Sequence, residues 1–310
     1  MKLPTWSSAW PRPRPTAHNN PQVPRPPIPK PKSTVDQLPT ATVPPAPTSL
    51  PPATHFLLLL SDSALPLGSF AFSSGLESYL AHHQHSPQTS ANSNTPASFT
   101  SFLPLSISSY ASTTLPFVLA AHRDPSLPTL AFLDDTLDAA VVCTVGRRAS
   151  VAQGRALLGI WERSFAPAAA AGGSNAVGGG AEALRGFSSL LKKASSSSSS
   201  GGGDEPPAVA AHLAPLFGAI CALVGLDLAQ TAYVFMLGHV KALVSAAVRA
   251  GVFGPYQAQK TLASGAVQGL ITAVIEREWE TRVEEAGQSV PVMDLWVGRH
   301  EVLYSRIFNS

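Results

Sequence analysis

Serine, aspartate and histidine side chains gather early in the chain, where they could form a hydrolytic triad. Ser61 or Ser63 would be the nucleophile, Asp62 the orienting carboxylate, and His82 or His83 the base. Geometry defines a triad, so the order of these residues does not exclude it. Serines next to the start of a helix more often bond to free backbone N–H groups. A small helical serine hydrolase is therefore the alternative to a protein without catalytic residues.

A histidine cluster stands at the end of the same stretch. His82, His83 and His85 carry imidazoles, which are good ligands for nickel or zinc. Adjacent histidines on a helix diverge, and no cysteine, aspartate or fourth histidine stands near them in sequence. The cluster predicts at most weak metal binding, and the alternative is a solvated helix end.

Other signs of enzyme chemistry are missing from the sequence. It has no Gly-rich phosphate loop, dinucleotide-binding glycine motif, H-E-x-x-H or G-x-S-x-G segment. Five glutamates between residues 276 and 285 alternate with two arginines, a pattern typical of a solvated helix face. We therefore expect a protein that is not an enzyme.

The composition of the 310-residue chain is uneven. Residues 1–54 hold 16 of the 29 prolines, six basic residues and one acidic residue, while the remainder carries a mild negative charge. No broad basic surface for nucleic acid is expected. Frequent proline favours extended polyproline geometry, so residues 1–54 are predicted to be disordered. A mitochondrial presequence, which these prolines disfavour, and a ligand for a proline-binding module are the alternatives.

Cysteine usage and hydropathy bear on the compartment. Cys143 and Cys221 form no C-x-x-C motif and are expected to be small buried side chains in a reducing cytoplasm. The longest apolar run, residues 216–226, ends at Asp227 and is shorter than the ~18 residues that a membrane span needs. We expect a cytoplasmic protein without a membrane partner.

A low-complexity insertion divides the folded part of the chain. Residues 166–180 and 195–203 are rich in alanine, glycine or serine and poor in large apolar side chains. They predict a flexible insertion over residues 164–207, with a possible short helix at 181–194. The remaining sequence predicts one domain over residues 55–310.

The apolar spacing in this domain is helical, and no series of short alternating strands occurs. The sequence therefore predicts an all-α fold. The clearest helix starts at Asp227, with Gln230 at the capping-box position, and ends at Gly251. Pro255 suits the first turn of the next helix.

That next helix is predicted over about residues 256–282. Gly265 and Gly269, four residues apart, would let another helix approach it closely. Further helices are predicted near residues 74–83, 98–122, 127–142, 145–163, 208–225 and 294–308.

The stretch SDSALPLGSFAFSSGLE, residues 61–77, has the composition of a loop with a defined shape. Pro66 fixes one φ angle, and Gly68 and Gly75 permit dihedral angles that other residues avoid. Ser69, Ser73 and Ser74 can bond to backbone groups. We expect a rigid entry into the first helix of the domain.

This stretch closely resembles the signature of the UreF family of urease accessory proteins. Four more segments resemble the family in the same order, and together the five span nearly all of residues 55–310. The N-terminal tail and the insertion have no counterpart in the family pattern. The four segments are GRRASVAQGRALL at 146–158, HLAPLFGAICALVGL at 212–226, VSAAVRAGVFGPYQAQK at 244–260 and RHEVLYSRIFNS at 299–310.

The resemblance implies a UreF-like helical bundle without catalytic activity or a cofactor of its own. It implies a homodimeric scaffold that binds the UreD/UreH-type accessory protein and the UreG-type GTPase. These partners would handle nickel and GTP during GTP-dependent nickel insertion into apo-urease. Whether the protein activates or gates the GTPase is left open by the sequence.

The C-terminal segment is the predicted partner-binding element. Arg306 among apolar residues suits a helical tail that orders on a partner, and the alternative is that its apolar neighbours cover the protein's own core. Arg147 and Arg249 are either partner contacts or charges at helix C-termini. The predicted partner-binding residues are Gly68, Ser69, Phe72, Ser73, Gly75, Arg147, Arg249, Tyr304, Arg306 and Phe308, among which Gly68 and Gly75 are expected to act through the backbone.

Overall fold

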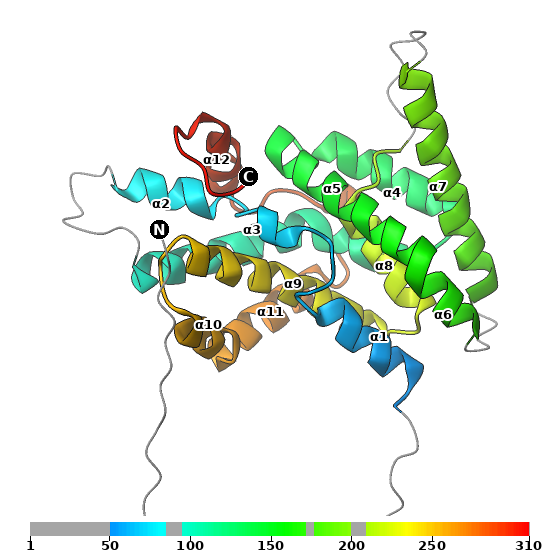
Figure 1. The fold of residues 1–310 in the computed structure, drawn as a ribbon, viewed down its shortest axis with the longest axis horizontal. Coiled ribbons are helices and arrows are strands. Elements are labelled where there is room, and N and C mark those ends of the chain that lie inside the picture. Colours follow the sequence, from blue (N-terminus) through cyan, green and yellow to red (C-terminus); the bar gives the residue numbers. More distant parts are fainter. Residues whose placement is uncertain (1–49, 85–94, 172–176, 200–208, 310) are drawn as a thin grey trace, which may run out of the picture. The chain divides into compact units, whose positions relative to one another are not determined.

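Helices are the regular elements of the described residues, 50–84, 95–171, 177–199 and 209–309, in this computed structural model (Figure 1). No strand occurs among these residues, which all belong to one unit, residues 48–310. The predicted all-α class is confirmed for this part of the chain. Residues 1–49, most of the predicted N-terminal tail, lie outside the described residues. The first helix begins at Pro52, which is within the tail predicted over residues 1–54.

Twelve α-helices alternate with short 3₁₀ and π segments in the described ranges. They are α1 (Pro52–Ser61), η1 (Ser69–Ala71), α2 (Leu76–Gln84), α3 (Pro96–Arg123), α4 (Leu127–Ala140), α5 (Thr144–Ile160), the π-helical η2 (Trp161–Phe165), α6 (Ala166–Ala171), α7 (Val177–Ser199), α8 (Leu213–Leu223), α9 (Leu228–Arg249), α10 (Pro255–Leu262), α11 (Gly265–Glu278), η3 (Val283–Glu285), α12 (Val292–Arg299) and η4 (His300–Val302).

The core forms around α3, which packs against α8, α9 and α11 (Figure 1). Phe102, Ile107 and Leu115 of α3 are fully buried, as are Met236 and Val240 of α9. Each such side chain contributes roughly 1.5–3 kcal/mol by leaving water. By length and composition α3 and α9 could cross a membrane, but 67% and 56% of their most apolar windows are buried inside this bundle.

The helix-end signals around α9 act as the sequence predicts. Asp227 accepts the backbone N–H of Gln230, and the Gln230 side chain accepts the N–H of Asp227, which completes the capping box. Gly251 has a φ of +73°, and Pro255 occupies the first turn of α10. These predictions are confirmed.

The predicted long helix over residues 256–282 is two helices, α10 and α11. Ser264 separates them, because its hydroxyl accepts the backbone N–H of Val267 and caps α11. A Cβ on Gly265 or Gly269 would meet no atom within 4 Å, so the predicted close helix approach at these glycines is wrong. The neighbouring glutamates are not all solvated either, since Glu278 is buried and paired with Arg277.

The insertion is helical in its described parts, residues 164–171 and 177–199. The predicted short helix is confirmed within the longer α7, which packs against α4 and α8, with Leu184 and Phe187 fully buried. Phe165 also reaches the core just before α6. In α7 a few apolar side chains at helical spacing anchor otherwise low-complexity sequence, so this part of the insertion has more regular structure than the predicted short helix. Residues 172–176 and 200–207 lie outside the described residues.

Two predicted helices are shorter than the apolar pattern indicates. The helix predicted from residue 208 begins at Leu213, because the preceding backbone N–H groups bond to the carboxylate of Asp134. The helix predicted over residues 294–308 ends as α12 and η4 by residue 302. The N–H groups of residues 307 and 308 bond to Glu77 instead of continuing a helix.

Candidate partner-binding surface at the C-terminal tail

Residues 300–309, here called the tail, are held on the bundle by one carboxylate. Glu77, in the first turn of α2, accepts a hydrogen bond from His300 Nε2 at 2.9 Å. Its two oxygens also accept the backbone N–H groups of Ile307 at 2.6 Å and Phe308 at 3.2 Å. Hydrogen bonds to an ionised carboxylate are among the stronger ones in proteins, so Glu77 fixes both ends of the tail.

An arginine–aromatic contact secures the end of the tail. The Arg249 guanidinium lies 4.3 Å from the ring centroid of Phe308, which is only 5% exposed, and 5.9 Å from that of Phe70. It also donates a hydrogen bond to the carbonyl of Phe70. Cation–π contacts contribute about 0.5–2 kcal/mol each, depending on burial. Arg249 thus joins the last turn of α9, the loop at residue 70 and the tail.

A cluster of ion pairs lines the outer edge of the tail. Arg148 of α5 pairs with Glu301 at 2.5 Å and donates to the carbonyl of Asn309 at 3.2 Å. Arg306 pairs with the other oxygen of Glu301 at 3.2 Å. The hydrogen bond from Arg148, together with Arg306, lowers the pKa of Glu301 below its ordinary value. Because these side chains are exposed, the cluster orients the tail more than it stabilises the fold.

The loop of residues 62–75 forms the inner wall beside the tail. The backbone N–H of Asn309 bonds to the carbonyl of Ala71 at 2.8 Å. Gly75 has a φ of +86°, and a Cβ there would lie 3.1–3.2 Å from atoms of Trp296 and Val297 in α12. Gly68 caps η1 with a φ of +74°. The unusual dihedral angles predicted for both glycines are confirmed, and a side chain would strain each position.

The serines and Phe72 of this loop also face inward. Ser69 donates to Gln153 Oε1 at 2.7 Å, which ties the loop to α5. Ser73 is fully buried, and its hydroxyl accepts the N–H of Glu77 at 3.4 Å. Phe72 is half-buried and lines a pocket that opens to solvent. These residues hold the tail-binding surface in place from behind.

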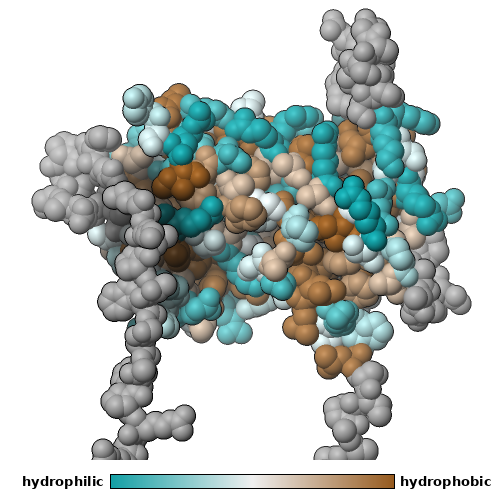
Figure 2. Space-filling view, viewed as in Figure 1, coloured by the Kyte–Doolittle hydropathy of each residue, from teal (hydrophilic) through white to brown (hydrophobic). Residues whose placement is uncertain are grey.

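The outward side of the tail and α12 carries exposed apolar side chains among polar ones. Tyr304 is fully exposed and Ile307 is 61% exposed, although neighbouring Phe308 is buried. Figure 2 shows apolar side chains among polar ones over α12 and the tail. Such exposed apolar groups are typical of protein–protein contact sites. The other large apolar residues exposed on these elements are Val292, Leu295 and Val302.

Arg147 lies in a different cluster from the other predicted residues. It makes a bidentate pair with Asp138 at 2.6 and 3.0 Å, and Asp138 also accepts from His212 Nε2 at 2.8 Å. Burial alone would raise the pKa of Asp138, but hydrogen bonds and charge from Arg147 and His212 lower it. Since Arg147 stands in the first turn of α5, its interpretation as a C-terminal helix charge is wrong. That interpretation fits Arg249.

Three of the predicted triad residues, Ser61, Asp62 and His82, bond within their own turns. Ser61 donates to Leu58 O at 3.0 Å, and Asp62 accepts the N–H of Ala64 at 2.9 Å. His82 Nδ1 bonds to Ser78 O at 2.7 Å, and its ring lies 5.5 Å from that of Trp296.

For the predicted histidine cluster, only His82 can be placed. The side chain of His83 and all of His85 lie outside the described residues. Within the described ranges, no three His, Cys, Asp or Glu side chains form a group that could hold a metal ion.

Sequence reasoning missed the two residues that fix the tail, Glu77 and His300. Both stand in motifs quoted for the resemblance, Glu77 at the end of SSGLE and His300 in RHEVLYSRIFNS. They are 223 positions apart, so only the fold shows that they form a pair. The available signal was an ionisable residue in each motif, Glu77 after a run of small and apolar residues and His300 before VLYSRIF.

Comparisons with known proteins identify the family to which this chain belongs. The UreF family model matches residues 93–266, more than half of the chain. An uncharacterized UreF-like urease accessory protein of Schizosaccharomyces pombe is 34% identical over 257 residues, 83% of this chain and 97% of its own. Urease accessory protein F of Oryza sativa subsp. indica is 32% identical over 80% of this chain and 82% of its own length. Urease accessory protein F of Arabidopsis thaliana is 31% identical over 81% of this chain and 90% of its own length. This chain therefore belongs to the UreF family of urease accessory proteins.

Proposed function

We propose that this protein is a non-enzymatic scaffold for assembly of the urease metallocentre. It binds a UreD/UreH-type accessory protein through the tail and α12, and it recruits a UreG-type GTPase for GTP-dependent nickel insertion into apo-urease. Nickel and GTP are handled by these partners, and the protein itself carries no cofactor. Membership of the urease accessory family supports this role.

The observation that carries the proposal is the two-sided character of the tail. Glu77 and Arg249 fix its inner side through Ile307, Phe308 and His300. The outer side presents Tyr304 and the side chain of Ile307 to solvent. A rigid support under exposed aromatic and aliphatic groups is the usual anatomy of an interface hot spot.

Co-purification with a UreD/UreH-type protein tests this assignment. We expect Tyr304→Ala to weaken binding about 10- to 100-fold, as loss of a central aromatic contact does at other interfaces. The matched control is Phe132→Ala, which removes an aromatic side chain that is 55% exposed on α4. Equal binding by both variants, or full binding after deletion of residues 299–310, would remove the tail from the interface.

We further propose that the protein is a cytoplasmic homodimer. Cys143 and Cys221 are both free, and Cys221 is fully buried, which agrees with a reducing compartment. Size-exclusion chromatography with light scattering, with and without the two accessory proteins, measures the stoichiometry. A single copy in every complex would exclude the dimer.

A further inference from the structure

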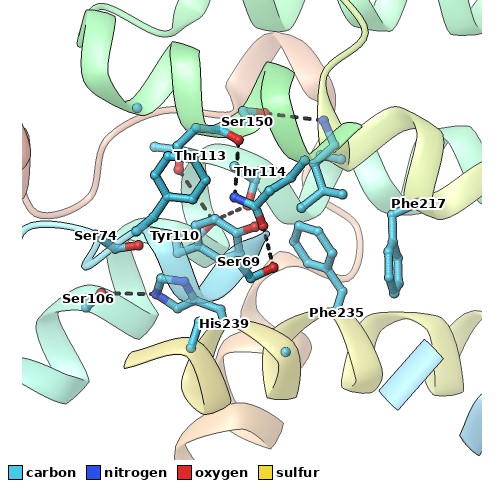
Figure 3. A pocket seen from close by; sticks show the side chains of 18 of the residues that line it. Ser69, Ser74, Ser106, Tyr110, Thr113, Thr114, Ser150, Phe217, Phe235 and His239 are labelled. Carbon is cyan, nitrogen blue, oxygen red and sulfur yellow. Dashed lines mark hydrogen bonds between the residues drawn. The ribbon is translucent and has the colours of Figure 1, made fainter. Parts of the chain in front are cut away.

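Two serines that each bond to a histidine line a pocket of about 520 Å³, between the loop of residues 62–74 and helices α3, α5, α8 and α9 (Figure 3). Ser106 Oγ lies 3.0 Å from His239 Nε2, and Ser150 Oγ lies 3.0 Å from His212 Nδ1. The lining of the pocket is mostly apolar, and its volume is within the roughly 300–1,000 Å³ that is usual for small-molecule sites. The scaffold role described above uses neither pair.

His212 also bonds to a carboxylate through its second ring nitrogen. Its Nε2 lies 2.8 Å from Asp138 Oδ1. Burial opposes ionisation of Asp138, but Arg147 and His212 lower its pKa, so it is a carboxylate at neutral pH. A carboxylate accepts the Nε2 proton, which leaves Nδ1 as the acceptor for the hydroxyl proton of Ser150. Carboxylate, imidazole and hydroxyl are thus joined in the order of a catalytic triad.

His239 provides the internal comparison, because it lacks this support. None of the described residues places a carboxylate on His239, and burial lowers its pKa to about 3. An imidazole with so low a pKa is a weak base at neutral pH. Ser106 therefore has an imidazole neighbour, as Ser150 does, but no activating base.

The backbone around His212 holds its ring in place. The carboxylate of Asp134 accepts the backbone N–H groups of this residue and of the two before it. Ala211 has a φ of +72°, in the left-handed region that residues other than glycine rarely adopt. A Cβ on Gly154 would clash with the carbonyl of Ala211, so its absence brings α5 close enough for Ser150 to reach the ring. Backbone strain of this kind clusters at functional sites.

The first turn of α8 lies against the same serine. The N–H of Leu213 donates to Ser150 Oγ at 3.3 Å, and Ala214, whose N–H has no acceptor within the helix, also lines the pocket. The N-terminus of a helix stabilises nearby negative charge, such as that of a tetrahedral oxyanion. Phe217 of α8 and Phe235 of α9 form part of the apolar wall (Figure 3). This wall gives an aliphatic chain a place to bind.

From these contacts we propose that Ser150 is a site of covalent acylation by activated thioesters. Ser150 Oγ attacks the carbonyl carbon while His212 Nδ1 takes the hydroxyl proton, and Asp138 stabilises the imidazolium that forms. The C–S bond then breaks, the leaving thiol takes the proton from His212, and the acyl group stays on Ser150 as an ester with its chain in the pocket. Because the His212 side chain has no exposed surface, water does not reach Nδ1 and the ester persists. The product is a modified chain, formed once and without turnover.

The test uses the full chain and the small thioester S-butyryl-N-acetylcysteamine. Intact-mass measurement follows the addition of butyryl groups, and tandem mass spectrometry locates them. Alkaline hydroxylamine cleaves a serine ester and leaves amides on lysine side chains, which separates the two products. We expect one hydroxylamine-sensitive butyryl group per chain, located at Ser150.

Four variants compare the two serines and the orienting carboxylate. Ser150→Ala should slow ester formation at least about 100-fold, since a nucleophile with a positioned base contributes a factor of this size. Ser106→Ala is the matched control and should leave the rate unchanged. Asp138→Asn should slow the reaction at least about tenfold, and Asp138→Glu, which keeps a carboxylate, should recover part of that rate.

Three results would overturn the proposal. These are absence of a hydroxylamine-sensitive butyryl group, an ester located at another serine such as Ser106, and equal rates for the unaltered protein and Asp138→Asn. Circular dichroism verifies that each variant keeps its helices. If Ser150→Ala does not, the location of the ester in the unaltered protein and the rate of Asp138→Asn decide the question.

Discussion

Two carboxylates in this protein each hold a non-helical segment through its backbone N–H groups, and their surroundings differ. Asp134 of α4 accepts the N–H groups of Ala210, Ala211 and His212 at 2.6, 3.1 and 2.6 Å, just before α8. Glu77 of α2 accepts hydrogen bonds from the backbone N–H groups of Ile307 and Phe308 and from the imidazole of His300, all in the tail. We call these the Asp134 clamp and the Glu77 clamp.

The Asp134 clamp is fully satisfied and enclosed. Asp134 and His212 are completely buried, and both ring nitrogens of His212 have partners, Asp138 and Ser150. The clamped segment leads directly into α8, which packs against α3 and α5 in the core. This segment cannot leave its carboxylate without exposing α8.

The Glu77 clamp is less complete. His300 is buried, yet its Nδ1 has no hydrogen-bond partner among the described atoms, which costs about 1–3 kcal/mol in the docked state. Beyond it, Tyr304 and Ile307 face solvent, and the described residues 303–309 form no helix. From this difference we expect the Asp134 clamp to be integral to the fold, and the segment held by the Glu77 clamp to be able to detach with little loss of core.

The largest effect is expected from Asp134→Ala. It leaves three buried N–H groups without an acceptor, so the free energy of unfolding should fall by about 3–5 kcal/mol. Urea denaturation followed by far-ultraviolet circular dichroism measures this change. Asp135→Ala is the control, because Asp135 is exposed on the next position of α4 and should change stability by less than about 0.5 kcal/mol. Equal midpoints for the two variants would show that the Asp134 clamp contributes nothing.

A second change tests the packing around the same clamp. A Cβ on Gly154 of α5 would lie 2.1 Å from the carbonyl oxygen of Ala211. Gly154→Ala should therefore lower the free energy of unfolding by about 1–3 kcal/mol through overpacking. Gly269→Ala, in open space on α11, should raise it by about 0.5–1 kcal/mol, because alanine favours a helix. Thermal and urea unfolding would contradict this if both variants shifted in the same direction.

These two clamps also explain which parts of the fold the sequence could predict. The helix class, the capping box at Asp227 and the positive φ at Gly68 and Gly75 follow from local signals, and all were found. The start of α8 and the end of α12 depend instead on Asp134 and Glu77, which are distant in sequence. The apolar periodicity of the sequence continues through both boundaries, so a prediction based on it makes both helices too long.

The candidate site was predictable to a similar extent. Motif resemblance selected Arg249, Arg306 and Phe308, which the fold brings to the tail, but it also included Arg147, which belongs with the Asp134 clamp. Nothing local separates Arg147 from Arg249, since both stand in helices close to glycine and alanine. Their assignment requires knowledge of which carboxylate or ring faces them.

Acidification should destabilise the Asp134 clamp less than the two substitutions do. It acts through Asp138, which bonds to the ring of His212 in the clamped segment. The pKa of Asp138 is lower in the folded protein, so the folded state binds fewer protons and this stabilisation is present above about pH 4. It is lost as the pH falls through the lowered pKa. Because Asp138 is partly exposed, the loss should be below about 1 kcal/mol. Urea midpoints between pH 3 and 7 should fall more steeply for the unaltered protein than for Asp138→Asn, and parallel profiles would contradict this.

The smallest change in global stability is expected from Glu77→Gln. The neutral side chain keeps its size but loses the charge that the tail N–H groups and His300 bond to, so the tail detaches. The free energy of unfolding should change by less than about 1 kcal/mol, since local opening leaves α3 and α9 packed. Hydrogen exchange should nevertheless accelerate at least about tenfold at the amides of Ile307 and Phe308.

Hydrogen exchange at two places decides between a detachable tail and a core element. In Glu77→Gln, faster exchange confined to residues 303–309, with α8 amides unchanged, would show that the Glu77 clamp opens independently of the fold. In Asp134→Ala, by contrast, α8 amides should exchange faster together with the whole bundle, because α8 is packed against α3. If Glu77→Gln instead accelerates exchange throughout α3 and α8, the tail is as integral as the segment before α8, and the distinction between the clamps fails.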